Sequence, residues 1–194
     1  MNRVLKGIEK RYNSVKTLES DFSETYKFQG RSRTETGVLY LRKPGRMRWD
    51  YRNPAGKLFV SDGKDAYFYT PDNNRAEKIK LKESEDLRAP MAFLLGRLDF
   101  SKEFQKFELR AEGQNVWISA FPKSDNLPYR QVQFLAAPDF RIERLIVTGQ
   151  DASILDFTFS GEKRNPAVND GLFRFQLPAG AQFVDSSRNA GAER

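Results

Sequence analysis

The hydrophobic pattern of the chain starts with the period of a helix and then changes to the period of strands. Over residues 3–18, apolar side chains recur at intervals near 3.6 residues, with charged side chains between them. This spacing predicts one amphipathic helix with a single buried stripe. From Phe22 to Phe28 the rings fall on even positions and the odd positions are polar. An alternation of two predicts a β-strand with one buried face.

Alternating segments then continue to residue 160, separated by short runs of Gly, Asn, Asp and Pro. These breaks recur about every 8–12 residues, which is typical of a meandering antiparallel sheet that closes into a sandwich or barrel. We predict a mainly β protein of about eleven strands: Phe22–Phe28, Gly37–Arg42, Arg46–Arg52, Lys57–Ser61, Ala66–Thr70, Arg75–Leu81, Phe104–Ala111, Val116–Phe121, Arg130–Ala136, Arg141–Thr148 and Ser153–Ser160.

The segment Lys82–Lys102 interrupts the strand pattern. Within it, Pro90 precedes good helix formers and Gly96 follows them, which predicts a short helix. The helix is apolar all round, so it must be buried or must face an apolar partner that is not always present. No shift in composition divides the chain, and we expect a single domain over residues 1–194 with a frayed tail at 186–194.

Composition removes several kinds of chemistry. The 194 residues include no Cys and no His, which excludes Cys/His metal sites, thiol nucleophiles and Ser-His-Asp triads. We expect no metal site and no cofactor. A carboxylate pair is the remaining catalytic option, but the spacing of Glu24, Asp50 and Asp62 does not bring any two together. We therefore expect no enzymatic activity.

The chain carries 33 Lys and Arg against 26 Asp and Glu, a formal charge of +7. A basic surface is compatible with nucleic acid, an acidic protein or anionic lipid headgroups. No recognised nucleic-acid-binding signature accompanies the charge, so we do not expect nucleic acid as a partner. Several strands are apolar on both faces, which favours a barrel or half-barrel with an apolar lumen for a hydrophobic ligand. The helix at Pro90–Leu95 would be its lid.

Five segments carry a family resemblance that runs from end to end. In order and spacing, these segments resemble the LolA family of outer-membrane lipoprotein carrier proteins. They are Gly37–Pro44 followed by Met47–Tyr51, then Leu58–Lys64, Tyr67–Tyr69, Ala89–Leu95 and Phe173–Pro178. The resemblance implies an incomplete antiparallel β-barrel covered by an N-terminal helix and a short lid helix. It also implies a periplasmic monomer whose leader has been removed. The cargo would be acylated lipoproteins, received from an inner-membrane ABC transporter and passed to an outer-membrane lipoprotein receptor.

The resemblance also implies the residues of the site. We expect the acyl chains in a cavity lined by Phe22, Leu39, Leu41, Met47, Trp49, Leu58, Val60 and Phe68, under a lid formed by Pro90, Met91, Phe93, Leu94 and Leu95. Ordinary core packing remains the alternative for each cavity residue. Lys43, with Arg42 before it, stands where the family commonly has an Arg that bonds lid carbonyls and closes the empty form. Lys is a single-point donor on a flexible stem, so we expect a looser closing bond. Glu24 stands where the family commonly has Gln.

Two alternatives share the fold. An outer-membrane receptor of the same fold begins at a lipid-bearing Cys, and the absence of Cys from this chain favours the carrier. A periplasmic lipid-binding or sensor protein could use the same barrel without lipoprotein cargo.

Overall fold

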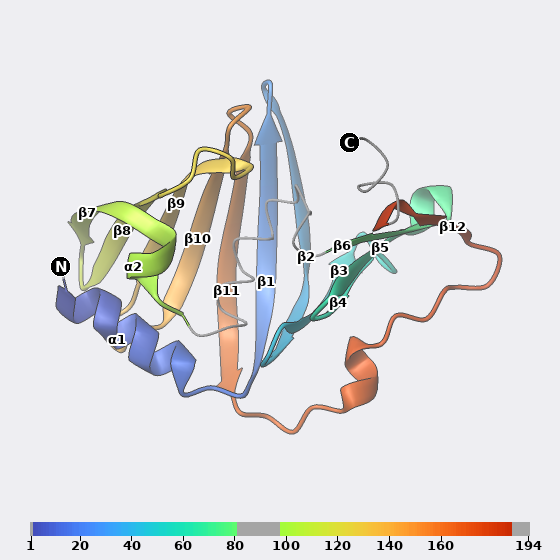
Figure 1. The fold of residues 1–194 in the computed structure, drawn as a ribbon, viewed down its shortest axis with the longest axis horizontal. Coiled ribbons are helices and arrows are strands. Elements are labelled where there is room, and N and C mark those ends of the chain that lie inside the picture. Colours follow the sequence, from blue (N-terminus) through green and yellow to red (C-terminus); the bar gives the residue numbers. More distant parts are fainter. Residues whose placement is uncertain (1, 81–97, 188–194) are drawn as a thin grey trace.

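The computed structural model describes residues 2–80 and 98–187, which form a mainly β structure (Figure 1). The elements are α1 (Asn2–Asn13), β1 (Thr17–Phe28), β2 (Arg31–Arg42), β3 (Arg46–Asn53), β4 (Leu58–Asp62), β5 (Asp65–Thr70), η1 (Pro71–Asn73), β6 (Arg75–Lys80), α2 (Phe100–Glu103), β7 (Phe104–Glu112), β8 (Asn115–Pro122), β9 (Tyr129–Ala136), β10 (Ile142–Gly149), β11 (Ile154–Arg164), η4 (Asp170–Phe173) and β12 (Gln182–Asp185).

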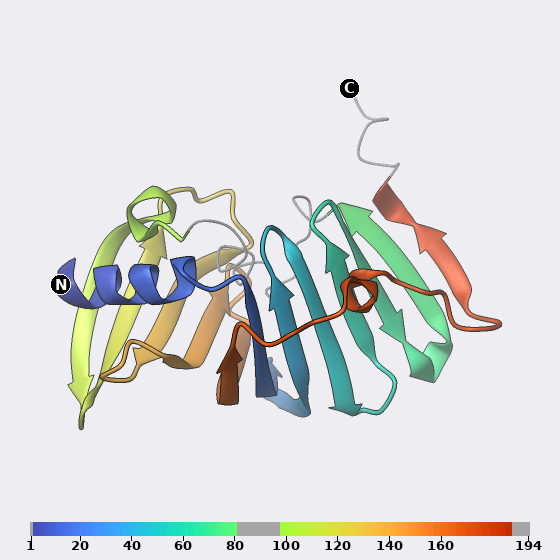
Figure 2. The same ribbon diagram turned by 90° about the horizontal axis from the view of Figure 1, so that it is seen from below.

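The strands form a single open sheet. Its order is β12-β6-β5-β4-β3-β2-β1-β11-β10-β9-β8-β7, and every neighbouring pair is antiparallel except β12 with β6. The two edge strands, β7 and β12, lie at opposite ends of the molecule, so the sheet does not close (Figures 1 and 2). The predicted incomplete antiparallel barrel is therefore confirmed. All eleven predicted strands are present, and β12 adds a twelfth that the sequence pattern does not indicate.

The N-terminal helix is shorter than its hydrophobic spacing predicts. Helix α1 ends at Asn13, and Thr17 already begins β1. Val15 and Leu18 are both buried and continue the apparent helical spacing, but Val15 lies in the connection and Leu18 in the strand. Spacing alone extends the helix too far because the first buried strand position falls in phase with the apolar stripe of the helix.

The sheet has two faces that different parts of the chain cover. Residues directly opposite each other on neighbouring strands point to the same face. The inner face carries Leu39, paired with Trp49, and Phe157, whose ring centroid is 5.2 Å from that of Trp49. Helix α1 packs over the inner face beside β9–β11 (Figure 1). The C-terminal segment with η4 crosses the outer face of β3 and β4 (Figure 2). Beyond η4, Phe175 stacks on Tyr67 of β5, with ring centroids 5.0 Å apart.

The inner face supplies one continuous core. Its ring contacts run from Phe22 through Trp49 to Phe157 in the centre of the sheet. At the β7 end, Phe100 of α2 packs edge-on against Phe134, with ring centroids 5.5 Å apart. Both ends belong to the same cluster of buried apolar side chains. Burial on this face is what positions the two helices.

Candidate functional site

The predicted cavity residues of β1, β2 and β3 lie side by side on the inner face. Leu39 pairs with Trp49 and Leu41 with Met47 across β2 and β3, and all four side chains are buried. The ring of Phe22 stands edge-on to Trp49, with centroids 4.7 Å apart. Six of the predicted cavity residues form a continuous apolar surface on this face: Phe22, Leu39, Leu41, Met47, Trp49 and Phe68.

Phe68 of β5 extends this surface toward the edge of the sheet. It pairs with Phe59, which in turn pairs with Trp49, so all three rings point to the inner face. The Phe59 and Phe68 rings are in edge contact at 5.1 Å. Phe68 itself is half-buried. Phe59 is a member of this surface that the sequence reasoning missed.

Leu58 and Val60 do not belong to the same surface. They pair with Asp50 and Arg48, which lie on the outer face. Val60 is fully buried there, where the Arg48 guanidinium donates to the Leu172 carbonyl oxygen at 3.1 Å. The prediction that these two residues line the inner cavity is therefore wrong. The cause is that β4 is apolar at consecutive positions, so the alternation does not reveal which parity faces inward.

Gly37 allows the Phe22 ring to pack closely against β2. A Cβ at this position would lie 2.8 Å from the Phe22 ring and 2.1 Å from the Asp50 carbonyl oxygen. Real Cβ atoms do not approach other atoms so closely, and a larger residue would force the strands apart. The glycine therefore sets the position of the ring at the centre of the inner face.

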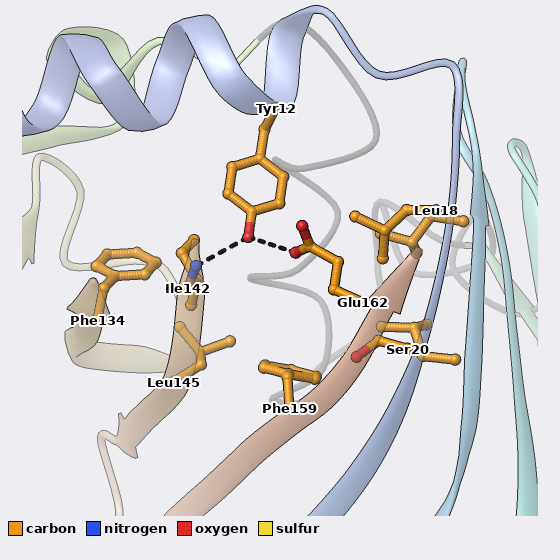
Figure 3. Close-up of a pocket in the computed structure, with 10 residues that line it drawn as sticks. Tyr12, Leu18, Ser20, Phe134, Ile142, Leu145, Phe159 and Glu162 are labelled. Atoms are coloured by element: carbon orange, nitrogen blue, oxygen red, sulfur yellow. Dashed lines mark hydrogen bonds between the residues drawn. The ribbon is translucent and has the colours of Figure 1, made fainter. Parts of the chain in front are cut away.

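A small pocket lies between α1 and the inner face (Figure 3). It is lined by Tyr12, Leu18, Ser20, Leu39, Leu41, Phe134, Ile142, Leu145, Phe159 and Glu162. Only three of these side chains are polar. The space that a water molecule can reach inside it is about 20 Å³, little more than one buried water requires. The pocket is thus apolar and narrow, and a hydrocarbon chain enters only if its walls move apart.

Tyr12 holds α1 over this pocket. Its side chain points from the helix toward β10 and β11 (Figure 3). The hydroxyl donates to Glu162 Oε2 at 3.0 Å and accepts from the Ile142 backbone N–H at 2.9 Å. Burial, and then the Glu162 carboxylate, raise the pKa of Tyr12 far above its ordinary value. The phenol therefore stays neutral and remains a donor.

Lys43, in the turn between β2 and β3, forms a hydrogen bond to the same helix. Its ammonium donates to the Tyr12 carbonyl oxygen at 2.7 Å, in the last turn of α1. Burial lowers the pKa of Lys43. A cation at a helix C-terminus also complements the helix dipole. The predicted role was a bond to lid carbonyls, and the described partner is instead a carbonyl of the N-terminal helix.

Arg42 does not close the pocket. It lies on the outer face, where it donates to the Val168 carbonyl oxygen at 2.9 Å and pairs with Asp170 at 2.6 Å. Its contacts hold the C-terminal segment against the sheet, which corrects the prediction that it assists closure. The predicted lid residues Pro90, Met91, Phe93, Leu94 and Leu95 lie outside the described residues, as does the tail beyond residue 187.

Helix α1 is also joined to the chain that begins at residue 98. The Asn13 side chain donates to the Leu98 carbonyl oxygen at 2.8 Å and accepts from the Leu98 N–H at 2.7 Å. The Glu9 carboxylate accepts from the Phe100 N–H at 2.9 Å. Residues 2–13 and 98–100 therefore form one roof over the β7–β11 half of the inner face.

A buried polar cluster lies on the inner face at the other end of β2. Glu24 accepts a hydrogen bond from the Tyr51 hydroxyl at 2.9 Å, and the Lys57 ammonium lies 4.5 Å from the centre of the Tyr51 ring. Lys57 also donates to Glu35, which pairs with Arg33 at 2.9 Å. Sequence reasoning noted only Glu24, since nothing in the pattern links it to the other members.

Two kinds of feature are absent from the described residues. Within 2–80 and 98–187, no group of three or more potential metal-ligand side chains is arranged around a common point. Over those same stretches, no helix combines the length and hydrophobicity needed to cross a lipid bilayer.

The architecture is that of an open antiparallel sheet with helices over one apolar face. The profile of the family described as outer membrane lipoprotein carrier protein LolA matches residues 13–176. The chain belongs to this family, as its resemblance predicts.

Relatives and solved structures agree with this assignment. An outer-membrane lipoprotein carrier protein of Dechloromonas aromatica is 30% identical over 176 residues, covering 88% of this chain and 82% of that protein. One of Nitrosospira multiformis is 27% identical over 173 residues, covering 88% and 83%. The crystal structure of a putative outer membrane lipoprotein-sorting protein domain from Vibrio parahaemolyticus matches with a TM-score of 0.54 at 12% identity, covering 88% of this chain and 94% of that one. At this level of sequence identity, the similarity to the Vibrio parahaemolyticus structure shows the fold alone.

Proposed function

We propose that this protein carries acylated lipoproteins, holding their acyl chains against the inner face of the open sheet. The observation that carries the proposal is an apolar surface on the sheet, continuous with a narrow apolar pocket under α1. Each methylene left in water costs about 0.8 kcal/mol, so a lipid anchor crossing an aqueous space needs a cover for many of them. Membership of the lipoprotein carrier family supports the same function.

The narrowness of the pocket implies that cargo binding moves the roof formed by α1 and residues 98–100. The Lys43 contact with the Tyr12 carbonyl oxygen is specific to the closed arrangement, because it joins the roof to the β2–β3 turn. A ligand that occupies the pocket displaces the roof and loses this contact. Reversible binding requires such a movable cover rather than a sealed core.

The proposal extends to place and partners. We expect the protein to act as a monomer in the periplasm, receiving lipoproteins from an inner-membrane ABC transporter and passing them to an outer-membrane lipoprotein receptor. We expect it to have no catalytic role, because covering hydrocarbon requires no nucleophile or titrating imidazole. No nucleic acid is expected among its partners.

Binding of a synthetic tripalmitoylated cysteine peptide tests the function. Native mass spectrometry of the purified protein should detect a complex with the acylated peptide and none with the same peptide lacking acyl chains. Reconstituted transfer from transporter-containing to receptor-containing liposomes then tests the handover. Absence of binding to the acylated peptide would contradict the proposed function.

A further inference from the structure

The outward side of the roof helix α1 is positively charged. Arg3, Lys6 and Lys10 are three and four residues apart, so they lie on the same side of the helix. All three are exposed, whereas Leu5 and Ile8 on the opposite side are buried against the sheet. We call Arg3, Lys6 and Lys10 the basic stripe, and it extends along about 10 Å of the helix.

The charges of the basic stripe are not neutralised by neighbouring acids. Within residues 2–80 and 98–187, none of its three side chains takes part in an ion pair. The acids that the structure joins to α1 are engaged elsewhere. Glu9, the only acid of the helix, accepts from the Phe100 N–H at 2.9 Å. Glu162 accepts from Arg11, which also pairs with Asp139 at 3.2 Å.

Two more cations continue the basic stripe past the end of α1. Lys16 is exposed in the connection to β1, and its N–H donates to the Asn165 side chain at 2.8 Å, next to the exposed Arg164. Neither Lys16 nor Arg164 pairs with an acid in the described part of the chain. Figure 2 shows α1 in front of the strands, with no other described element over it. The positive surface is therefore open to a partner.

The form of the basic stripe favours an extended anionic surface over one bound anion. A lysine ammonium is a point charge on a flexible stem, and unlike a guanidinium it does not impose the geometry of a single carboxylate or phosphate. The side chains also diverge from a convex helix, whereas a small anion requires donors that converge on it. A plane of anionic lipid headgroups is reached by all of them at once, and it attracts each Lys or Arg that comes near it.

We propose that the basic stripe docks this protein on membranes that contain anionic lipids, with α1 lying against the headgroups. Because α1 roofs the apolar pocket, docking places the roof beside the layer that a lipid anchor leaves or enters. The attraction is screened by salt, so it guides the protein to the membrane without fixing it there. This inference goes beyond the proposed carrier function and does not depend on it, since docking requires no cargo.

The test measures binding of the cargo-free full chain to vesicles by sedimentation. Vesicles of phosphatidylcholine and phosphatidylglycerol are compared with vesicles of phosphatidylcholine alone, at low and at physiological salt. The variant combines Arg3→Gln, Lys6→Gln and Lys10→Gln, because glutamine keeps a similar helix propensity and removes the charge. The wild type is expected to bind the anionic vesicles only, and more weakly at the higher salt. The variant is expected to bind them about a hundredfold more weakly.

A second variant loses the same net charge far from α1. It combines Lys27→Gln and Arg31→Gln, beside the β1–β2 turn, with Arg75→Gln at the start of β6, all at exposed positions. It should bind nearly as well as the wild type. Equal losses in the two variants would overturn the inference, as would failure of the wild type to bind anionic vesicles at low salt. Binding to polyglutamate without binding to vesicles would also overturn it, in favour of an acidic protein partner. Each of these results leaves the carrier function standing.

A measurement on the wild type alone does not depend on how a variant folds. Anionic vesicles should slow the chemical acetylation of Lys6, Lys10 and Lys16 and leave that of Lys27 unchanged, since Lys27 lies at the far end of β1. Unchanged acetylation at the three lysines, or equal slowing at Lys27, would overturn the proposed docking surface.

Discussion

The Lys43 ammonium lies 2.7 Å from the Tyr12 carbonyl oxygen and donates a hydrogen bond to it. This bond joins the turn between β2 and β3 to the last turn of α1. It is the direct link between the strands that carry Leu39 and Trp49 and the helix that roofs the pocket. The contact between these two residues therefore holds the roof in place over the apolar surface.

Replacing Lys43 by Leu is expected to leave the fold intact and to disrupt the handover of cargo. The closed form loses one charge-assisted hydrogen bond, which corresponds to about 1–2 kcal/mol. Because only the closed form makes the bond, binding should tighten by up to about thirtyfold and release should slow accordingly. Reconstituted transfer to the receptor measures this effect. Lys43→Arg, which keeps a donor, is the control, and normal handover by Lys43→Leu would refute the role.

Replacing Tyr12 by Phe is expected to loosen the roof without removing its apolar contact. The Ile142 N–H loses its described acceptor and Glu162 loses one donor, which corresponds to about 1–3 kcal/mol for buried groups. Amide hydrogen exchange in α1 should accelerate, whereas exchange in β1–β3 should change little. Tyr40→Phe, at a half-buried tyrosine of the outer face, is the matched control. Equal exchange in the Tyr12 variant and the wild type would contradict the assignment.

Substitutions on the two faces of the sheet should separate stability from binding. Leu39→Ala and Val60→Ala each leave a cavity in a fully buried position and should both lower the free energy of unfolding, by about 2–4 kcal/mol. Only Leu39→Ala removes ligand contact, so only that variant should weaken binding of an acylated peptide at equal folded concentration. A similar loss of affinity in Val60→Ala would contradict the assignment of Val60 to the outer face.

The free energy of unfolding should depend on pH through Asp65, at the β5–β6 end of the sheet. Its carboxylate accepts from Lys80 at 2.8 Å and pairs with Lys78 at 3.1 Å, and chiefly the Lys80 hydrogen bond lowers the pKa of Asp65 below its ordinary value of 3.8. The unfolded chain therefore binds a proton at Asp65 more readily than the folded protein does. The contribution of Asp65 to the free energy of unfolding is complete above pH 3.8 and is lost as the pH falls through the lower pKa of the folded state. Asp65→Asn should cost about 1 kcal/mol at pH 7. Urea unfolding should find the difference from wild type smaller at pH 3, and a constant difference would contradict this origin.

The strands could be predicted because each has polar and apolar side chains in alternation, bounded by turn residues. Which side chains of a strand point to the inner face could be predicted only where either the odd or the even positions alone are apolar. In β3 the parity of Met47 and Trp49 is unambiguous, whereas in β4 the run from Leu58 to Val60 is apolar throughout. Which of its side chains point inward depends on the register with β3, and register is a property of the pairing rather than of either strand.

The bonds that hold the roof were less accessible to prediction. The partner of Lys43 is a backbone carbonyl, which has no signature in the sequence, and Glu162 lies 150 residues from Tyr12 along the chain. The buried polar cluster of Glu24, Glu35, Tyr51 and Lys57 likewise joins β1, β2, β3 and the β3–β4 connection. Such sites arise from long-range pairing of strands, so only the family resemblance could indicate residues there in advance.

The two hydrogen bonds exchanged by Asn13 and Leu98, with the bond from the Phe100 N–H to Glu9, give the roof the mechanics of a single lever. Displacing α1 from the sheet therefore requires either that residues 98–100 move with it or that these three hydrogen bonds break as well.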